Sequence, residues 1–269
     1  MCSTSNAAAV DTGRCFRIPA PVLHRPVTGY YAAMGSPTVE ERYDVWHRER
    51  FQRIGGEFEP TSPWHRMALR QIPPGSLRGL RVLEVGCGAG HFAQWLHEQG
   101  GQVVAVDFSG EACMIARTVA DPAVEVLQLD AQDLVGRLGR DRFDLVISLE
   151  TLEHVPDHNR ALREIVAVTR PGGRIIVSTP NHLSAQGLHR LMMWMARRPY
   201  SEMGQPINNV MIGAARPWKL RRLGCRVDAV DGAVYFLQIP GTDRRINLRF
   251  LRRFKRLAMH VMVAATKNP

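Results

Sequence analysis

Short apolar runs alternate with helix-like segments between residues 80 and 181, and this alternation restricts the chain to a few folds. The strand-like runs are 80–85, 102–106, 124–129, 143–148 and 174–178, and helical patterns cover 90–99, 109–119 and 158–169. Strands joined by helical crossovers form a parallel sheet with helices on both faces. The sequence therefore predicts an α/β fold with a Rossmann-like, mostly parallel sheet, in which ligands bind beyond the carboxyl ends of the strands.

Four regions follow from this pattern. Residues 1–37 are rich in Ala, Ser, Thr and Pro, and they predict a flexible tail, with a targeting segment as the alternative. Residues 38–74 predict a helical N-terminal cap, and residues 75–182 a cofactor-binding core. Residues 183–269 predict an acceptor-side region that completes the sheet.

The positive charge of the chain is concentrated near its C-terminus. The net charge is +10, and residues 216–256 hold twelve Lys and Arg against three Asp. Within this stretch, Asp243 to Ala258 predicts an amphipathic helix with Phe250 and Phe254 on one side and Arg249 and Arg253 on the other. Such a basic helix, 244–256, is a solvated surface, a peripheral contact with an anionic membrane, or an RNA surface. RNA is the less favoured partner, because aromatic residues make up only 7% of the chain and do not interleave the arginines.

The cysteines and the hydropathy favour a cytoplasmic compartment. The five cysteines are odd in number, widely spaced and never C-x-x-C, which argues against a disulfide framework and for a reducing environment. No run approaches the roughly 18 apolar residues that span a bilayer. We therefore expect a cytoplasmic protein, with a peripheral position at a membrane surface left open.

A glycine-rich loop follows the first strand and predicts a nucleotide site. Glu84 lies in the strand, and Gly86, Gly88 and Gly90 follow it, with Cys87 between the first two glycines. Glycines allow a tight turn and a close backbone approach to a ligand at a helix N-terminus. The third glycine comes one residue too early for a nicotinamide fingerprint. Because a carboxylate repels a pyrophosphate and attracts an ammonium group, the loop favours a nucleoside that carries an amino acid.

Two more carboxylates end the next strands. Asp107 lies twenty-one residues after Gly86, at the distance where a carboxylate accepts hydrogen bonds from ribose hydroxyls. Asp130 ends the third strand, where a polar side chain can bind the edge of an adenine. One Asp alone is more often a solvated residue or a helix cap, but matched positions in consecutive elements favour a binding role over coincidence.

Together these segments resemble the class I S-adenosylmethionine-dependent methyltransferases. The matching segments are E-V-G-C-G-A-G-H at 84–91, V-A-V-D-F-S at 104–109, L-D-A-Q-D at 129–133 and R-P-G-G-R at 170–174. The resemblance implies a seven-stranded sheet with a reversed last strand, and S-adenosylmethionine bound by residues 75–182. The residues that it implies for the cofactor are Glu84, Gly86, Cys87, Gly88, Gly90, Asp107, Phe108, Asp130, Ala131 and Leu149.

A cluster of ionisable residues follows the fourth strand and predicts the acceptor end of the site. Glu150, Glu153 and His154 share one face if the segment is a helical turn. Two carboxylates and an imidazole are a ligand set for Mg²⁺ or a similar cation, and the alternative is a metal-free site in which the histidine is a base. His182 follows the fifth strand and is expected to reach the same pocket.

The pattern E-x-x-E-H-V-P-D at 150–157 is similar to that of the ubiquinone-biosynthesis O-methyltransferases, and so is the segment from Gly56 to Pro60. That resemblance implies a divalent metal on the two glutamates and the histidine. The small-RNA 3′-terminal 2′-O-methyltransferases also share the E-x-x-E-H pattern, together with S-T-P-N at 178–181. The part of the chain beyond about residue 183 matches neither family, so the acceptor stays open.

The sequence as a whole predicts a methyltransferase that O-methylates a small hydroxylated molecule, phenolic or lipid-linked. The predicted catalytic residues are His154, Glu153 and His182, because an acceptor hydroxyl must lose its proton. The predicted metal ligands are Glu150, Glu153 and His154. The alternatives are an RNA 2′-O-methyltransferase and a non-catalytic, cofactor-binding partner subunit.

Overall fold

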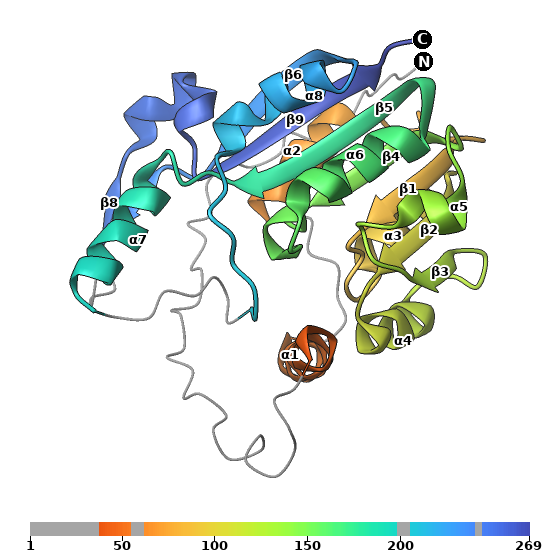
Figure 1. Cartoon of the computed structure of the whole chain (residues 1–269), viewed down its shortest axis with the longest axis horizontal. Coiled ribbons are helices and arrows are strands. Elements are labelled where there is room, and N and C mark those ends of the chain that lie inside the picture. The colour runs from red at the N-terminus through yellow and green to blue at the C-terminus, as the bar shows by residue number, and fades with distance from the viewer. Residues whose placement is uncertain (1–37, 55–61, 198–204, 240–243) are drawn as a thin grey trace, which may run out of the picture.

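A seven-stranded sheet forms the centre of the molecule (Figure 1). The structure is a computed structural model, and it describes residues 38–54, 62–197, 205–239 and 244–269. The strand order is β3-β2-β1-β4-β5-β9-β6. The strands are β1 (Arg81–Val85), β2 (Gln102–Asp107), β3 (Glu125–Gln128), β4 (Phe143–Leu149), β5 (Thr169–Pro180), β6 (Cys225–Ala233) and β9 (His260–Lys267).

The register confirms the predicted mostly parallel sheet with a reversed last strand. β1 to β5 pair in parallel, and β9 pairs antiparallel with both β5 and β6. The carboxyl ends of β1, β2 and β4 therefore lie at one edge of the sheet. The loops that carry the predicted site residues all leave from that edge.

Helices cover both faces of the sheet because the strands are apolar on both sides. In β1, Val82 packs with α2, α3 and α4, whereas Leu83 packs with α5, α6 and α8. This alternation divides the core into two clusters, one on each face. The helices are α1 (Val39–Ile54), α2 (Pro63–Gln71), α3 (His91–Glu98), α4 (Gly110–Val119), α5 (Leu134–Leu138), α6 (His158–Val168), α7 (Ala185–Met195) and α8 (Arg216–Arg222).

The helix α1 lies apart from the sheet and contacts α4 (Figure 1). Asp44 of α1 accepts hydrogen bonds from the Ser109 hydroxyl (2.5 Å) and the Glu111 backbone N–H (3.1 Å). Glu40 accepts one from the Gln128 amide at 2.6 Å. These bonds attach α1 to the residues after β2 and to the last residue of β3, so the helix lies over the carboxyl edge of the sheet.

The segment predicted as one basic helix from Asp243 to Ala258 is not an α-helix, and that prediction was wrong. It contains the strand β8 (Arg245–Asn247) and two 3₁₀ helices, η3 (Arg249–Arg253) and η4 (Lys255–Leu257). β8 pairs with β7 (Phe236–Gln238), and the Leu248 N–H donates to the carbonyl of Tyr235. This hairpin uses the backbone groups of residues 245–248 that a helix would need, and the residues between it and β9 form the two 3₁₀ helices instead.

Two parts of the sequence prediction concern segments outside the described residues, and a third concerns membrane-spanning helices. The tail predicted for residues 1–37 and the similarity at Gly56 to Pro60 lie outside the described residues. Among the residues that the structure describes, none of the helices has the length and apolar character needed to cross a bilayer.

Candidate functional site

The glycine-rich loop turns back over β2 directly after β1. The backbone N–H groups of Gly86 and Cys87 both donate to the carbonyl of Val106, at 2.8 and 3.0 Å. Gly86, Gly88 and Gly90 all have positive φ values, of 80°, 53° and 79°. A Cβ atom on Gly86 would overlap the side chain of Thr151, so only glycine fits there.

The Glu84 carboxylate is buried below this loop. It is 6% exposed, and its Oε2 atom has no hydrogen-bond partner within the described chain. Burial, with a contribution from the negative charge of Asp107, raises the pKa of Glu84. A buried acceptor without a donor costs free energy, and a ligand with an ammonium group would supply both the donor and the countercharge.

The space over the loop is open beside Gly88. A Cβ on Gly88 would meet only the His47 ring of α1, at 3.8 Å. Cys87 is buried, and burial raises the pKa of its thiol, so the cysteine is a packed neutral side chain. The loop therefore offers backbone, and not a reactive thiol, to a ligand.

Asp107 connects the loop to the N-terminus of α4. Its carboxylate accepts from the Gly88 N–H at 2.9 Å and from the Ser109 N–H at 3.1 Å. Ser109 caps α4 by accepting from the Ala112 N–H. Because the carboxylate holds two backbone segments in place, it is oriented at the carboxyl edge of β2, with oxygen lone pairs left for a ligand.

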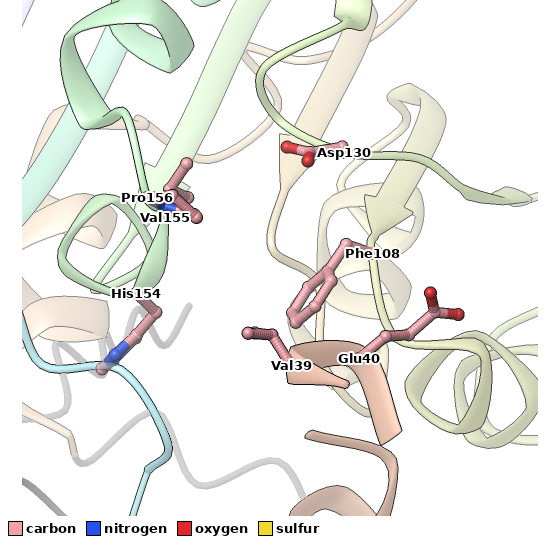
Figure 2. Close-up of a pocket in the computed structure, with 7 residues that line it drawn as sticks. All are labelled: Val39, Glu40, Phe108, Asp130, His154, Val155 and Pro156. Atoms are coloured by element: carbon pink, nitrogen blue, oxygen red, sulfur yellow. The ribbon is translucent and has the colours of Figure 1, made fainter. Parts of the chain in front are cut away.

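A pocket of about 220 Å³ lies next to Asp107 at this edge (Figure 2). Figure 2 shows Phe108 and Asp130 on one side and His154, Val155 and Pro156 on the other. Val39 and Glu40 from α1 complete the lining. Of the other predicted cofactor residues, Ala131 is buried in the core on one face of the sheet and Leu149 packs against the core on the other face, and neither is among the residues that line the pocket.

Sequence reasoning missed the contribution of Tyr43 in α1. Its ring lies 4.9 Å from that of Phe108 and 6.3 Å from that of His154, centroid to centroid. Burial raises the pKa of Tyr43, so the phenol stays protonated. The spacing of Tyr43 and His47, four residues apart on one helix face, was the available signal.

The turn after β4 differs from the predicted helical turn. Only Leu152–His154 is helical, as the 3₁₀ helix η1, and Glu150 precedes it with a left-handed φ of 51°. The Thr151 hydroxyl donates to the carbonyls of Val85 and Leu149, at 3.2 and 3.1 Å. Glu150, Glu153 and His154 therefore do not lie on one helix face, and that expectation was wrong.

His154 is held in one orientation by its backbone neighbours. Its Nδ1 atom is 2.6 Å from the carbonyl oxygen of Ile207, and its Nε2 atom is 3.7 Å from Oε1 of Glu153. Since a carbonyl only accepts, Nδ1 carries the proton, and Nε2 of the neutral ring is the basic nitrogen. Glu153 is 2% exposed and lies beside that nitrogen.

The segment 205–212 covers this turn. Asn209 donates from its backbone to the Glu153 carbonyl (2.9 Å) and from its side chain to the Val155 carbonyl (2.8 Å). The hydroxyl of Tyr43 bonds to the backbone of Ile207 at 3.4 Å. Sequence reasoning gave no signal for these contacts, because they join residues far apart in the chain.

His182 and Glu150 interact with different groups. His182 bonds to the backbone of Met211 and lies 3.5 Å from the Arg190 guanidinium, and it is not among the residues that line the pocket. Glu150 accepts from the Ser178 hydroxyl at 2.7 Å and pairs with Nδ1 of His260 at 2.7 Å. Both side chains brace the strand ends around β5 and β9.

The predicted metal ligands do not fit a metal site in this geometry. Within the described ranges, no three His, Cys, Asp or Glu side chains gather closely enough to hold a metal ion. Both carboxylate oxygens of Glu150 are used by Ser178 and His260.

Comparison with known proteins defines the class. Residues 83–177 match the family model described as a methyltransferase domain. The fold is similar to that of an S-adenosylmethionine-dependent methyltransferase from Mesorhizobium loti, with 24% identity, a TM-score of 0.54, and 75% of this chain and 96% of that chain covered. It is also similar to magnesium protoporphyrin IX methyltransferase from Synechocystis, with 16% identity, a TM-score of 0.57, and 86% and 98% covered. Residues 83–177 therefore form a methyltransferase domain, and the sheet has the class I methyltransferase fold.

Several curated relatives carry one name. The chain is 40% identical over 131 residues to a ubiquinone biosynthesis O-methyltransferase from Alkalilimnicola ehrlichii, covering 47% of this chain and 53% of the relative. It is 35% identical over 137 residues to that of Aeromonas salmonicida, covering 49% and 57%. The chain thus spans little more than half the length of these relatives.

The buried carboxylate at position 84 generates a first prediction. We expect Glu84→Gln to weaken binding of S-adenosylmethionine about 10- to 100-fold, since a charged hydrogen bond to an ammonium group is lost. Binding of 5′-methylthioadenosine, which lacks the amino acid, should stay unchanged. Isothermal titration calorimetry measures both, and an equal loss for the two ligands would contradict the assignment.

The same site has a predicted pH dependence. An ammonium ligand binds the ionised carboxylate, and the pKa of Glu84 is raised in the free protein. Affinity should therefore be full well above that pKa and fall as the pH drops through it, at a higher pH than for an ordinary glutamate. The Glu84→Gln variant should lose this dependence.

The contact between Gly86 and Thr151 generates a second prediction. Gly86→Ala should lower the free energy of unfolding by more than Gly75→Ala, as measured in urea. Both glycines have positive φ, so both variants carry a backbone cost of about 1–2 kcal/mol, but a Cβ on Gly75 meets nothing within 4 Å. Equal losses of unfolding free energy in the two variants would show that the Thr151 side chain moves aside without cost, and would contradict this prediction.

Proposed function

We propose that this chain is an S-adenosylmethionine-dependent O-methyltransferase that acts on a small hydroxylated molecule, phenolic or lipid-linked. The observation that supports this most strongly is the fixed tautomer of His154. Its Nδ1 bonds to the Ile207 carbonyl, and its basic Nε2 lies at the end of β4 beside the pocket. An oxygen nucleophile of ordinary phenolic pKa, about 10, needs such a base at neutral pH.

The residues that we assign to the cofactor lie at the carboxyl ends of the strands and in the loops that follow them. Glu84 would bind the ammonium group of S-adenosylmethionine, and the backbone of Gly86, Cys87, Gly88 and Gly90 would cradle its methionine part. Asp107 would accept from the ribose hydroxyls. Phe108 and Asp130 would flank the adenine in the pocket, whereas Ala131 and Leu149 lie outside its lining. The unpartnered Glu84 oxygen and the open space over Gly88 support this fit.

The bound cofactor supplies a methyl group on a sulfonium, which is already activated for in-line displacement. The chain then needs to align the acceptor and remove its proton. Nε2 of His154 would take the proton from the acceptor hydroxyl. Glu153, whose Oε1 atom is 3.7 Å away, would stabilise the imidazolium that forms.

Other residues keep this arrangement rigid. The segment 205–212 and Tyr43 hold His154 by way of Ile207, and together they cover the turn. We propose that His182 is a positioning residue, because its contacts with Met211 anchor that segment. The cap at 38–74 and the region 183–269 would then enclose the acceptor over the core at 75–182.

The names of the relatives and the residues of the site favour a small acceptor. The relatives are named as ubiquinone biosynthesis O-methyltransferases. The methyltransferase domain matched at residues 83–177 includes His154. An RNA acceptor and a non-catalytic partner subunit are the competing functions. Cys87, Cys113 and Cys225 are free and buried, which supports a cytoplasmic location.

Transfer of a methyl group tests the proposal. Purified protein, methyl-labelled S-adenosylmethionine and cell extract should give label in the organic-soluble fraction. Label in RNA would identify the competing enzyme. Absence of label in every fraction, with cofactor binding intact, would favour the non-catalytic function.

His154→Ala should lower kcat about 100- to 10,000-fold, the usual contribution of a general base. Binding of S-adenosylmethionine should change little, because His154 lies across the pocket from Phe108 and Asp130, the residues that would flank the adenine. The matched control is His158→Ala in α6, which should keep its kcat. A parallel loss of cofactor binding in His154→Ala would indicate a structural role.

The geometry of Glu150 predicts the effect of chelation. Since Ser178 and His260 use both of its carboxylate oxygens, methyl transfer should persist in EDTA, and added Mg²⁺ should change the rate less than twofold. Loss of turnover in EDTA with recovery on Mg²⁺ would restore the metal site implied by the resemblance.

A further inference from the structure

The Arg216 side chain is a buried cation at the start of α8. It is 3% exposed. Its Nη2 atom donates to the sulfur of Met211 at 3.5 Å, whereas Nε and Nη1 have no hydrogen-bond partner among the described residues. Arginine is rarely buried this far unless it is paired, and a buried cation without an anion nearby costs free energy. The guanidinium therefore requires a negative charge close to it.

The contacts of Arg216 lead to the turn that carries Glu153. Met211, whose sulfur accepts from the guanidinium, belongs to the segment 205–212. Two residues earlier in that segment, Asn209 donates from its backbone to the Glu153 carbonyl at 2.9 Å and from its side chain to the Val155 carbonyl at 2.8 Å. Arg216 and Glu153 are thus both attached to residues 209–211.

The Glu153 carboxylate is the negative charge that acts on Arg216. Burial lowers the pKa of Arg216 to about 10, and the charge of Glu153 opposes this lowering, so the guanidinium stays a cation at neutral pH. The charge of Arg216 acts on two other groups, Lys219 and His158, and both are basic. Burial lowers the pKa of each, and the positive charge of Arg216 lowers it further. Within the described part of the chain, Glu153 is therefore the counter-charge of Arg216.

Glu153 needs a cation for the same reason. Its side chain is 2% exposed, and burial of a carboxylate is costly unless a positive charge balances it. The neighbouring His154 ring is neutral in the resting protein, because its one proton lies on Nδ1 and bonds to the Ile207 carbonyl. The ring becomes a cation only when it takes a proton from the acceptor. A permanent positive charge for Glu153 must come from another residue.

We propose that Arg216 is a positioning residue, whose buried guanidinium balances the Glu153 carboxylate and holds it beside Nε2 of His154. A carboxylate that is already desolvated and oriented does not reorganise when the imidazolium forms, so it stabilises the new charge more strongly. This use rests on the proposed function, whereas the pairing of Arg216 with Glu153 does not.

Urea unfolding of the full chain tests the pairing without an assay of activity. Arg216→Met and Glu153→Gln should each lower the urea midpoint, because each leaves one buried charge uncompensated. The double variant Glu153→Gln/Arg216→Met removes both charges, so its midpoint should fall by less than the sum of the two single shifts. Additive shifts would overturn the pairing. If Arg216→Met alone does not fold, the double variant should still fold, and its failure to do so would overturn the pairing equally.

The rate of methyl transfer tests the positioning role. With labelled S-adenosylmethionine and the organic-soluble fraction of cell extract as the acceptor, Arg216→Met should lower the rate about tenfold, a typical coupling between charged neighbours. Arg216→Lys keeps the charge and should restore most of the rate. Binding of S-adenosylmethionine, measured by calorimetry, should not change in either variant. Arg221→Met replaces an exposed arginine of the same helix, and it should keep both the rate and the urea midpoint.

The double variant separates positioning from a merely structural role. If Arg216 acts through Glu153, adding Arg216→Met to Glu153→Gln should cause no further loss of rate. A further tenfold loss would show that the arginine acts independently of Glu153, and an unchanged rate in Arg216→Met alone would also overturn the positioning role. Coupled urea midpoints in a chain that labels no fraction of the extract would support the pairing and reject the proposed function.

Discussion

The carboxylate of Asp107 is the interaction on which the rest of the site depends. It holds the N–H of Gly88 in the glycine-rich loop and the N–H of Ser109 at the start of α4. Ser109 in turn donates to Asp44, so α1 is attached to the same point. One buried acceptor therefore fixes the loop after β1, the cap of α4 and the helix that covers them, which a neutral side chain at 107 could not do as strongly.

The acceptor side is built on long-range backbone contacts. His154 acquires its tautomer from the Ile207 carbonyl, and Ile207 is held by Tyr43, 164 residues earlier in the chain. The turn itself is tied to the cofactor loop by Thr151, whose hydroxyl donates to Val85. The cofactor and acceptor ends thus share one rigid framework, as alignment of two reactants requires.

The sequence predicted the parts of the structure whose causes are local. Alternating apolar runs define β1 to β5, and a loop of glycines after a strand allows few geometries, so the sheet and Gly86 to Gly90 were predictable. The helix expected over Asp243 to Ala258 failed because pairing of β8 with β7 outweighed its helical periodicity. The single face expected for Glu150 and His154 failed because the left-handed φ of Glu150 turns it toward His260.

The proposed cofactor and acceptor ends of the site are built from different kinds of structure. The proposed cofactor end is made of strand ends and the loops that follow them, whose geometry the sheet dictates. The turn after β4, at the proposed acceptor end, is covered by residues 205–212, which lie between α7 and α8 and belong to no helix of the layers. Hydrogen bonds of His189 and Arg190 hold the apolar side of α7 outward. These hydrogen bonds fix the rotation of α7 about its own axis. The fold therefore keeps the apolar side of α7 exposed to solvent.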